Sequence, residues 1–231
     1  MDQVILACTD PSAPSRSAVD WAEQEARLHG LPMRTFLGAP PDPGRAKVIV
    51  CGAPHGADDT DRPLGSLLPA AARATDRPLV LVPDGRASAH RSGKVLLGMD
   101  AREPSDGTID FAFDSARVRD ALLHVVHTWS LPPCAAEWPF AVPETERATW
   151  EDQEVQLLAD VLRPWRARCP RVAVREDVVL LPPVQALLHH AESAALIVVG
   201  REPGTEWGEV VRALLHEAAS PVAVVPAREA P

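Results

Sequence analysis

The chain repeats itself, and this repeat limits the possible folds more than any other feature of the sequence. The segment Val4-Ile-Leu-Ala-Cys-Thr-Asp10 matches Lys94-Val-Leu-Leu-Gly-Met-Asp100, at an offset of 90 residues. Near the end of each copy a second match appears at an offset of 143, between Pro78-Leu-Val-Leu-Val-Pro83 and Pro221-Val-Ala-Val-Val-Pro226. The two matches lie on either side of an insertion, and each keeps one offset over several residues. This indicates two copies of one structural unit.

The two copies differ in length. The growth of the offset from 90 to 143 makes the second copy longer by 53 residues, which fall between Trp129 and about Ala194. We therefore predict a truncated unit over residues 1–84, a polar linker over 85–92 and a complete unit over 93–231.

Apolar runs of strand length alternate with segments of helical periodicity in both copies. In the second copy they predict strands over 94–99, 122–127, 172–180, 196–199 and 222–225, and helices over 106–121, 145–167, 183–191 and 208–218. The first copy keeps strands 3–9, 33–37, 47–51 and 79–82 and helices 14–29 and 65–75. It lacks one edge strand and two helices. Such alternation predicts parallel strands wound into an open Rossmann-like sheet, and Pro164 is expected to kink its helix or end it early.

Composition and charge narrow the class of protein. The net charge of −9 argues against a duplex nucleic acid as partner, because such binding needs a basic face. No apolar run approaches the roughly 20 residues that span a bilayer. Four cysteines without a CxxC pair do not suggest a disulfide framework, and the first residues lack the pattern of a secretion signal. We therefore expect a cytoplasmic protein with no membrane partner.

The element order, with an Asp closing the first strand and a glycine-spaced loop after the fourth, resembles the universal stress protein family. The phrase "TDPSAPSRSAVDWAEQEARLHG" is similar to duplicated members of that family. The resemblance implies a tandem of two adenine nucleotide α-hydrolase-like units. It also implies that the Asp contacts adenine, and that a Gly-x2-Gly-x9-Gly-(Ser/Thr) loop holds ribose and phosphates in members that bind ATP.

The first copy departs from this loop pattern at one position. Gly52 and the pair Gly65-Ser66 have the family's overall spacing, but His55 takes the place of the middle glycine and Gly56 follows it. A shift of one residue still allows backbone N–H groups to turn toward phosphate oxygens. The resemblance therefore implies an ATP site, with Mg²⁺ to offset nearby carboxylates. Its residues are Asp10, Gly52, Gly56, Gly65 and Ser66. Asp10 has the alternative role of a turn or N-cap carboxylate.

The second copy departs further. Its loop from Gly200 to Gly208 is shorter than the family pattern, and Glu209 replaces the hydroxyl residue. A carboxylate in the first turn of a helix occupies the place that a phosphate would use. We therefore expect this copy not to bind ATP, and Asp100 to act as a turn carboxylate. The residues of this degenerate site are Asp100, His127, Gly200, Gly204 and Gly208.

The histidines and other reactive residues form no recognised catalytic or metal motif. His189 and His190 are adjacent on a predicted helix, so they point to different sides. His124 and His127 lie three apart on a predicted strand, which sends them to opposite faces. No Gly-x-Ser-x-Gly elbow, Cys–His signature or GxxxxGK[ST] loop occurs. We therefore predict no metal site and no enzymatic activity.

These patterns together favour a non-enzymatic stress-response or signalling scaffold with degenerate nucleotide sites and an unidentified protein partner. An edge strand rich in Val and Leu is a template for another strand. We therefore predict that strands 79–82 and 222–225 pair within the chain as a pseudo-dimer, which leaves a further homodimer open. Two alternatives remain, an ATP-binding sensor that uses the first copy and an adenine-nucleotide hydrolase-like enzyme.

Overall fold

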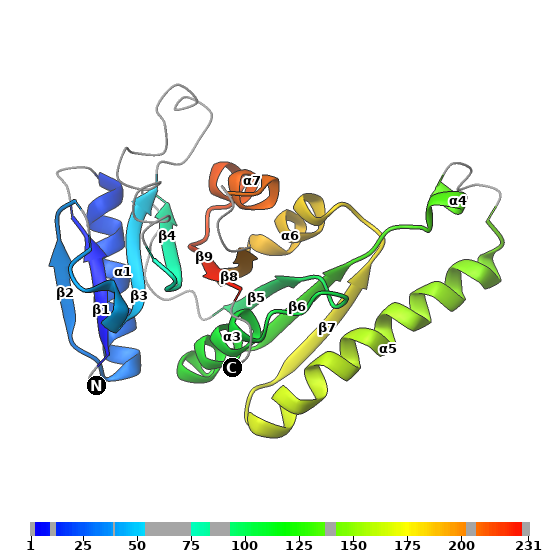
Figure 1. Ribbon diagram of the computed structural model, residues 1–231, viewed down its shortest axis with the longest axis horizontal. Coiled ribbons are helices and arrows are strands. Elements are labelled where there is room, and N and C mark those ends of the chain that lie inside the picture. Colours follow the sequence, from blue (N-terminus) through cyan, green and yellow to red (C-terminus); the bar gives the residue numbers. More distant parts are fainter. Residues whose placement is uncertain are drawn as a thin grey trace.

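The computed structural model describes residues 3–9, 13–38, 40–53, 75–83, 93–136, 142–201 and 207–227 (Figure 1). Its strands are β1 (Val4–Cys8), β2 (Met33–Phe36), β3 (Ala46–Ala53), β4 (Leu79–Pro83), β5 (Lys94–Met99), β6 (Leu123–Thr128), β7 (Val174–Val179), β8 (Ala194–Arg201) and β9 (Val222–Pro226). Its helices are α1 (Ala13–His29), the 3₁₀ turn η1 (Pro43–Arg45), α3 (Asp106–Arg119), α4 (Pro133–Ala136), α5 (Glu144–Arg168), α6 (Pro183–Ala191) and α7 (Glu209–Glu217). The predicted helix 65–75 lies outside the described residues.

The described strands form one sheet in the order β2-β1-β3-β4-β9-β8-β5-β6-β7. Neighbouring strands run parallel except at the centre, where β4 pairs antiparallel with β9. The register there sets Leu79 opposite Val224 and Leu81 opposite Val222. The predicted intrachain pairing of the last strands is therefore confirmed, and the prediction of an open, mainly parallel α/β sheet is confirmed with it.

The two halves of this sheet repeat the same backbone details. The N–H of Ile5 donates to Pro32 O at 2.9 Å, and the N–H of Val95 donates to Leu122 O at the same distance. Gly30 and Asp120, which lie 90 residues apart, both end a helix in the left-handed conformation, with φ of 62° and 49°. The register shifts by one residue between Val4 and Ile5 where β1 pairs with β3, and between Lys94 and Val95 where β5 pairs with β8. These equivalences agree with the duplication predicted from the sequence.

The halves differ between their second and third equivalent strands. In the second half, α4, α5, β7 and α6 lie between β6 and β8. In the first half, the described residues between β2 and β3 contain only the turn η1. In the described part, the first half therefore lacks counterparts of the edge strand β7 and of the helices α4, α5 and α6, which agrees with the predicted loss of one edge strand and two helices apart from the short α4.

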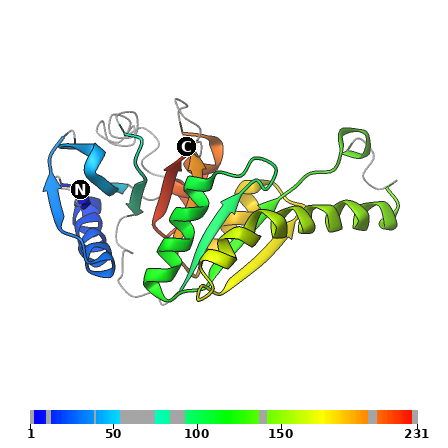
Figure 2. The same ribbon diagram turned by 60° about the horizontal axis from the view of Figure 1, so that its bottom comes forward.

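Helices cover both faces of the sheet and make two cores. On one face α1, α3 and α5 pack over alternate strand residues such as Ile5, Val95 and Leu123. Figure 2 shows α3 and α5 in front of the strands on this face. On the other face α6 and α7 pack over residues of opposite parity, including Leu96 and Val126. This alternation follows from the period of two along each strand.

Helix α5 continues through Pro164 and ends at Arg168, so of the two effects expected of the proline, a kink or an early end, the early end does not occur. The residue after the proline, Trp165, is buried and stacks on Phe113 of α3 with ring centroids 6.1 Å apart. Packing of this kind compensates for the hydrogen bond that a proline removes from a helix. The aromatic contact thus holds the last turn of α5 on the sheet.

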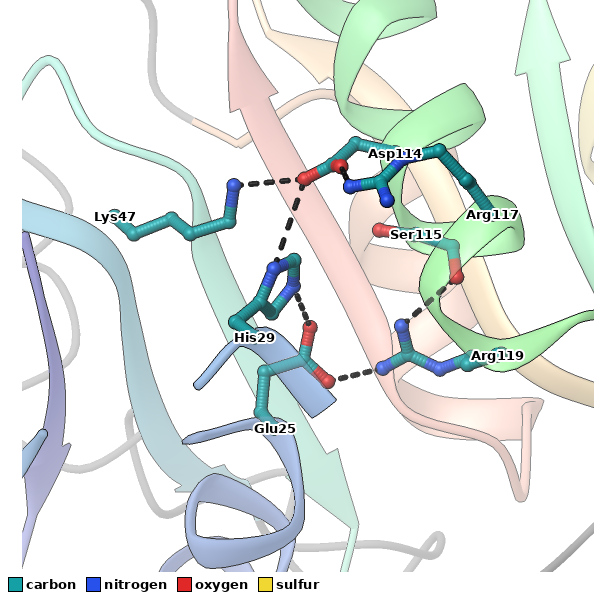
Figure 3. A network of polar contacts seen from close by, with 7 residues as sticks. All are labelled: Glu25, His29, Lys47, Asp114, Ser115, Arg117 and Arg119. Atoms are coloured by element: carbon teal, nitrogen blue, oxygen red, sulfur yellow. Dashed lines mark hydrogen bonds and ion pairs between the residues drawn. The ribbon is translucent and has the colours of Figure 1, made fainter. Parts of the chain in front are cut away.

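A polar network joins α1 of the first half to α3 of the second (Figure 3). Glu25 is only 2% exposed, and it accepts hydrogen bonds from Arg119 and, at 3.0 Å, from His29. Asp114 pairs with Arg117 and, at 2.7 Å, with Lys47 of β3. His29 Nδ1 also lies 3.8 Å from Asp114 Oδ2, so three contacts of the network cross from one half to the other.

Acid is expected to weaken this junction. Burial by itself raises the pKa of Glu25, but His29 and Arg119 outweigh it and lower that pKa below the ordinary 4.5. Lys47 and Arg117 likewise outweigh burial and lower the pKa of Asp114 below 3.8. A depressed carboxyl pKa adds stability above the unfolded-state value, and this is lost as the pH falls through the folded-state value. The free energy of unfolding in urea should therefore fall between about pH 5 and about pH 2.

The variant Asp114→Asn provides the control for this pH dependence. It should be less stable than the wild type at neutral pH, because Lys47 and Arg117 lose their partner. The difference should shrink toward zero as the pH falls and Asp114 becomes protonated in the wild type. Parallel pH profiles for the two proteins would contradict the expectation.

Candidate functional site

A cavity of about 340 Å³ opens at the carboxyl ends of β5 and β8, beside the amino end of α3. Strand β5 pairs with β6, the next strand along the chain, on one side and with β8 on the other side. Ligands in open α/β sheets bind at such a point, where the strand order turns. The volume lies within the range of small-molecule sites. The lining residues include Gly98, Met99, Val126, Thr128, Val199 and Gly200 from strands, and Ser105, Thr108, Ile109, Leu187, Val210 and Val211 from helices.

Two glycines allow helices to approach the strands at this point. A Cβ atom on Gly98 would lie 2.7 Å from a terminal carbon of Leu187, so α6 packs directly against the β5 backbone. A Cβ atom on Gly200 would lie 3.3 Å from Thr108 Oγ1 of α3. The sequence interpretation placed Gly200 in a degenerate site, and the structure places it in the cavity wall.

The polar groups of the cavity come mainly from the start of α3. Ser105 caps this helix by accepting a hydrogen bond from the Thr108 N–H at 3.4 Å, and the two hydroxyl oxygens lie 3.0 Å apart. Asp100 and Glu103 add carboxylates to the wall. Its described lining residues include no lysine or arginine. The cavity thus offers hydroxyl groups and negative charge beside an apolar floor.

Asp100 also has a local structural role. Its Oδ1 accepts a hydrogen bond from the N–H of Arg102 at 2.9 Å, which closes an Asx turn between β5 and α3. The turn role predicted for this residue is therefore confirmed. The same side chain lies at the cavity, so the turn fixes a carboxylate beside the ligand space.

His127 does not line this cavity, which corrects the prediction that placed it at the ligand. Strand alternation turns Val126 and Thr128 toward the cavity and His127 toward α5. His127 is fully buried, and its Nε2 lies 3.0 Å from Glu154 Oε2. Its Nδ1 lies 3.3 Å from the Ala101 N and 3.4 Å from the Met99 O. The imidazole therefore ties α5 to β6 and to the turn after β5.

Glu154 of α5 contacts two residues near the cavity. Besides His127 it pairs with Arg102, the residue that completes the Asx turn. Burial by itself raises the pKa of Glu154, but the hydrogen bonds from Arg102 and His127 outweigh it and hold that pKa below its ordinary value. Glu154 thus stays ionised and links the turn at the cavity to the long helix.

The remaining predicted site residues divide into two groups. Gly52 lies inside β3, opposite Val82, so the strand extends past the predicted end at residue 51. Gly208 is the N-cap of α7, and it is followed by the exposed Glu209 in the first turn. The other predicted residues lie outside the described part of the chain, and these are Asp10, Gly56, Gly65, Ser66 and Gly204.

A larger groove of about 1200 Å³ adjoins the cavity and shares Asp100, Thr128 and Pro183 with it. It runs between α5 and the segments that follow β6 and β7, and its wall includes Trp129 and Trp150. Trp129 is buried, and its Nε1 has no hydrogen-bond partner among the described residues. The sequence does not predict this groove, because Trp129 and Trp150 are brought together only when α5 packs on the sheet.

The structure thus defines a class of protein: an open α/β sheet with a ligand-sized cavity at the carboxyl edge of one half. The sequence model of the universal stress protein family matches residues 92–226. The chain therefore belongs to this family. The match covers the second half and confirms the family predicted from the sequence.

Relatives and solved structures agree with this assignment. The chain is 31% identical over 172 residues to universal stress protein Rv1996 of Mycobacterium tuberculosis, covering 70% of this chain and 53% of that protein. It is 33% identical over 142 residues to universal stress protein Rv2623, covering 60% of this chain and 46% of that protein. The chain thus spans about half the length of the curated relatives it matches.

Among solved structures, a universal stress protein from Archaeoglobus fulgidus superposes with a TM-score of 0.65 at 13% identity. That match covers 97% of this chain and 98% of the other. The functionally unknown protein PA1789 from Pseudomonas aeruginosa superposes with a TM-score of 0.54 at 18% identity, covering 98% and 82%. Both likenesses concern the fold. None of the helices in the described residues has the length and apolar character needed to span a membrane.

Proposed function

We propose that this chain is a non-enzymatic, cytoplasmic stress-response protein. It is a two-repeat family member with a shortened first repeat, and it acts by conformation and by association with a protein partner. Pairing of β4 with β9 inside the chain supports an internal pseudo-dimer, since it buries both last strands at the centre of one sheet. The lack of a catalytic motif supports a role without turnover.

The nucleotide site of the second half is proposed to keep only its nucleoside part. The observation that carries this proposal is a cavity with an apolar floor, hydroxyl groups and carboxylates but no described lining cation. A purine and a ribose match such a surface. Phosphates would face Asp100, Glu103 and, at the start of α7, Glu209. Each like-charge pair near 4 Å costs about 1 kcal/mol in water and more when partly buried. The site therefore favours a nucleoside over ATP.

Calorimetric titration with adenosine and with ATP and Mg²⁺ tests this preference. Adenosine is expected to bind at least about 10-fold more tightly than ATP, since 1.4 kcal/mol is a factor of ten. Gly200→Leu should abolish adenosine binding, because the new side chain fills space beside Thr108. Gly208→Ala is the matched control, because a Cβ there meets nothing within 4 Å. It should bind as the wild type does.

Other outcomes would favour the alternatives. ATP binding that survives in Gly200→Leu but is lost in Gly65→Val combined with Ser66→Ala would assign a sensor site to the first half. ATP turnover above background would indicate an enzyme and contradict the proposed role. Absence of any heat with adenosine would leave the family assignment intact but remove the nucleoside site.

A further inference from the structure

Three side chains that could ligate a metal converge on the sheet face opposite α5, and none of them lines the cavity. They are His124 of β6, Asp177 of β7 and His190 in the last turn of α6. One ligand atom from each lies within 4.8 Å of the other two. His124 Nε2 is 2.7 Å from Asp177 Oδ2, and His190 Nε2 is 3.9 Å from the same oxygen.

The register of the two strands creates this cluster. Val126 pairs with Asp177, so His124 and Asp177 are diagonal neighbours on one face of adjacent parallel strands. Helix α6 then covers this face and places His190 against His124, with ring centroids 4.7 Å apart. In the described part of the first half, β7 and α6 have no counterparts. Asp177 and His190 therefore belong to the added segment, whereas His124 lies on β6, a strand that both halves have.

His124 is not satisfied by the protein alone. Its side chain is fully buried, and its Nδ1 has no hydrogen-bond partner within the described residues. A buried polar atom without a partner costs about 1–3 kcal/mol, and proteins rarely leave one without a reason. The other ring nitrogen, Nε2, faces Asp177 Oδ2 at 2.7 Å, and it is the atom that a cation shared with Asp177 and His190 would bind.

Neighbouring cations set the strength of such a site. Arg175 lies on the same strand with its Nη2 3.1 Å from Asp177 Oδ2, and Lys94 is close enough to act on both histidines. The side chain of Arg175 is 60% exposed, so it can turn away from the carboxylate. Its partnership with Asp177 also resembles the outer-shell hydrogen bond that orients a carboxylate ligand. Binding should therefore be exchangeable and weaker than in a structural site with four ligands.

We propose that His124, Asp177 and His190 form a binding site for a first-row divalent cation of the zinc type. Two imidazoles and one carboxylate are a donor set that Zn²⁺ accepts, with a fourth position left for water or for a group of a partner protein. Hard cations such as Mg²⁺ and Ca²⁺ prefer all-oxygen sites and are not expected here.

Titration of the full chain with zinc chloride, after removal of metals by a chelator, tests the site. Wild-type protein should bind zinc and gain thermal stability by mass action. His190→Ala and Asp177→Asn should each weaken binding by at least about 10-fold, the lower limit for loss of even an outer-shell partner. His189→Ala is the control, because His189 is exposed and outside the cluster while its ring still packs against His190, with centroids 4.9 Å apart. It should bind zinc as the wild type does.

Cobalt provides a second measurement, since Co²⁺ in a four-coordinate site absorbs visible light. The absorption should appear in wild type and His189→Ala and be absent in His190→Ala and Asp177→Asn. Circular dichroism of each variant in the presence of chelator establishes whether it is folded. If His190→Ala does not fold, His190→Gln is used in its place. No zinc binding by the wild type, equal binding by all variants, or equal loss in His189→Ala would each overturn the proposal.

Discussion

Replacing Arg119 with methionine is expected to lower the free energy of unfolding at pH 7 by about 3–5 kcal/mol. The substitution leaves Glu25, which is almost fully buried, without the guanidinium that crosses from α3 to meet it. Among the described residues, His29 on the same helix then remains as the polar partner of Glu25, through a contact of 3.0 Å. Removing one partner of a buried ion pair is costly because the other charge stays buried. Urea unfolding followed by circular dichroism measures the change.

Two controls separate the buried charge from the loss of a surface pair. Arg117→Met removes a half-exposed guanidinium from Asp114, which keeps Lys47, so its cost should stay within about 1 kcal/mol. The double variant Glu25→Gln with Arg119→Met should be more stable than Arg119→Met alone, since the uncompensated charge is gone. A cost for Arg119→Met within about 1 kcal/mol of zero, or a double variant less stable than the single one, would contradict the expectation.

The position of this pair reflects the repeat. At the offset of 90 residues, His29 corresponds to Arg119 and Glu25 to Ser115. In each half the later residue reaches back one helical turn, since His29 contacts Glu25 and Arg119 donates to the Ser115 carbonyl at 3.1 Å. Two copies of Glu25 would bring like charges together at the junction. The serine at the equivalent position of the second half avoids this, so the junction joins one carboxylate to one guanidinium.

The repeat also explains how much of the fold was predictable. Strand lengths and order follow from apolar runs such as those that begin at Val4 and Lys94, and the last strands paired as expected because both are apolar and end at a proline. The path of α5 through Pro164 was not predictable, because it depends on the contact of Trp165 with Phe113, which are far apart in the sequence. Local propensity yields to tertiary packing in such cases.

The site was predictable in its place but not in its details. Asp100 and Gly200 lie at the cavity, as expected for ends of strands that meet at one edge of the sheet. His127 points to the sheet face that α5 covers and not to the cavity, and the sequence does not show which face α5 covers. The cluster of His124, Asp177 and His190 has no motif spacing, because it needs the register of β6 with β7 and the packing of α6. Only contacts between distant segments reveal it.

The first half is expected not to fold by itself. A fragment of residues 1–88 should lack a cooperative unfolding transition, whereas residues 93–231 should show one. In the whole chain β4 lies between β3 and β9, and Leu79, Val80 and Leu81 are nearly inaccessible to solvent. The fragment loses β9 and α3, so these side chains meet water at a new edge and Glu25 loses Arg119. Circular dichroism with thermal and urea unfolding of both fragments measures the outcome.

The magnitude of the loss supports complete unfolding of the fragment. Small domains have free energies of unfolding of about 5–15 kcal/mol, and the shortest ones lie at the low end. Loss of Arg119 alone removes about 3–5 kcal/mol, and the central strand pairing is lost as well. The full chain with Arg119→Met is the matched control, because it breaks the same ion pair but keeps β4 against β9, and it should still unfold cooperatively. A folded, monomeric fragment 1–88 would show that the halves are independent, and the pairing of β4 with β9 would then join two stable units instead of completing one.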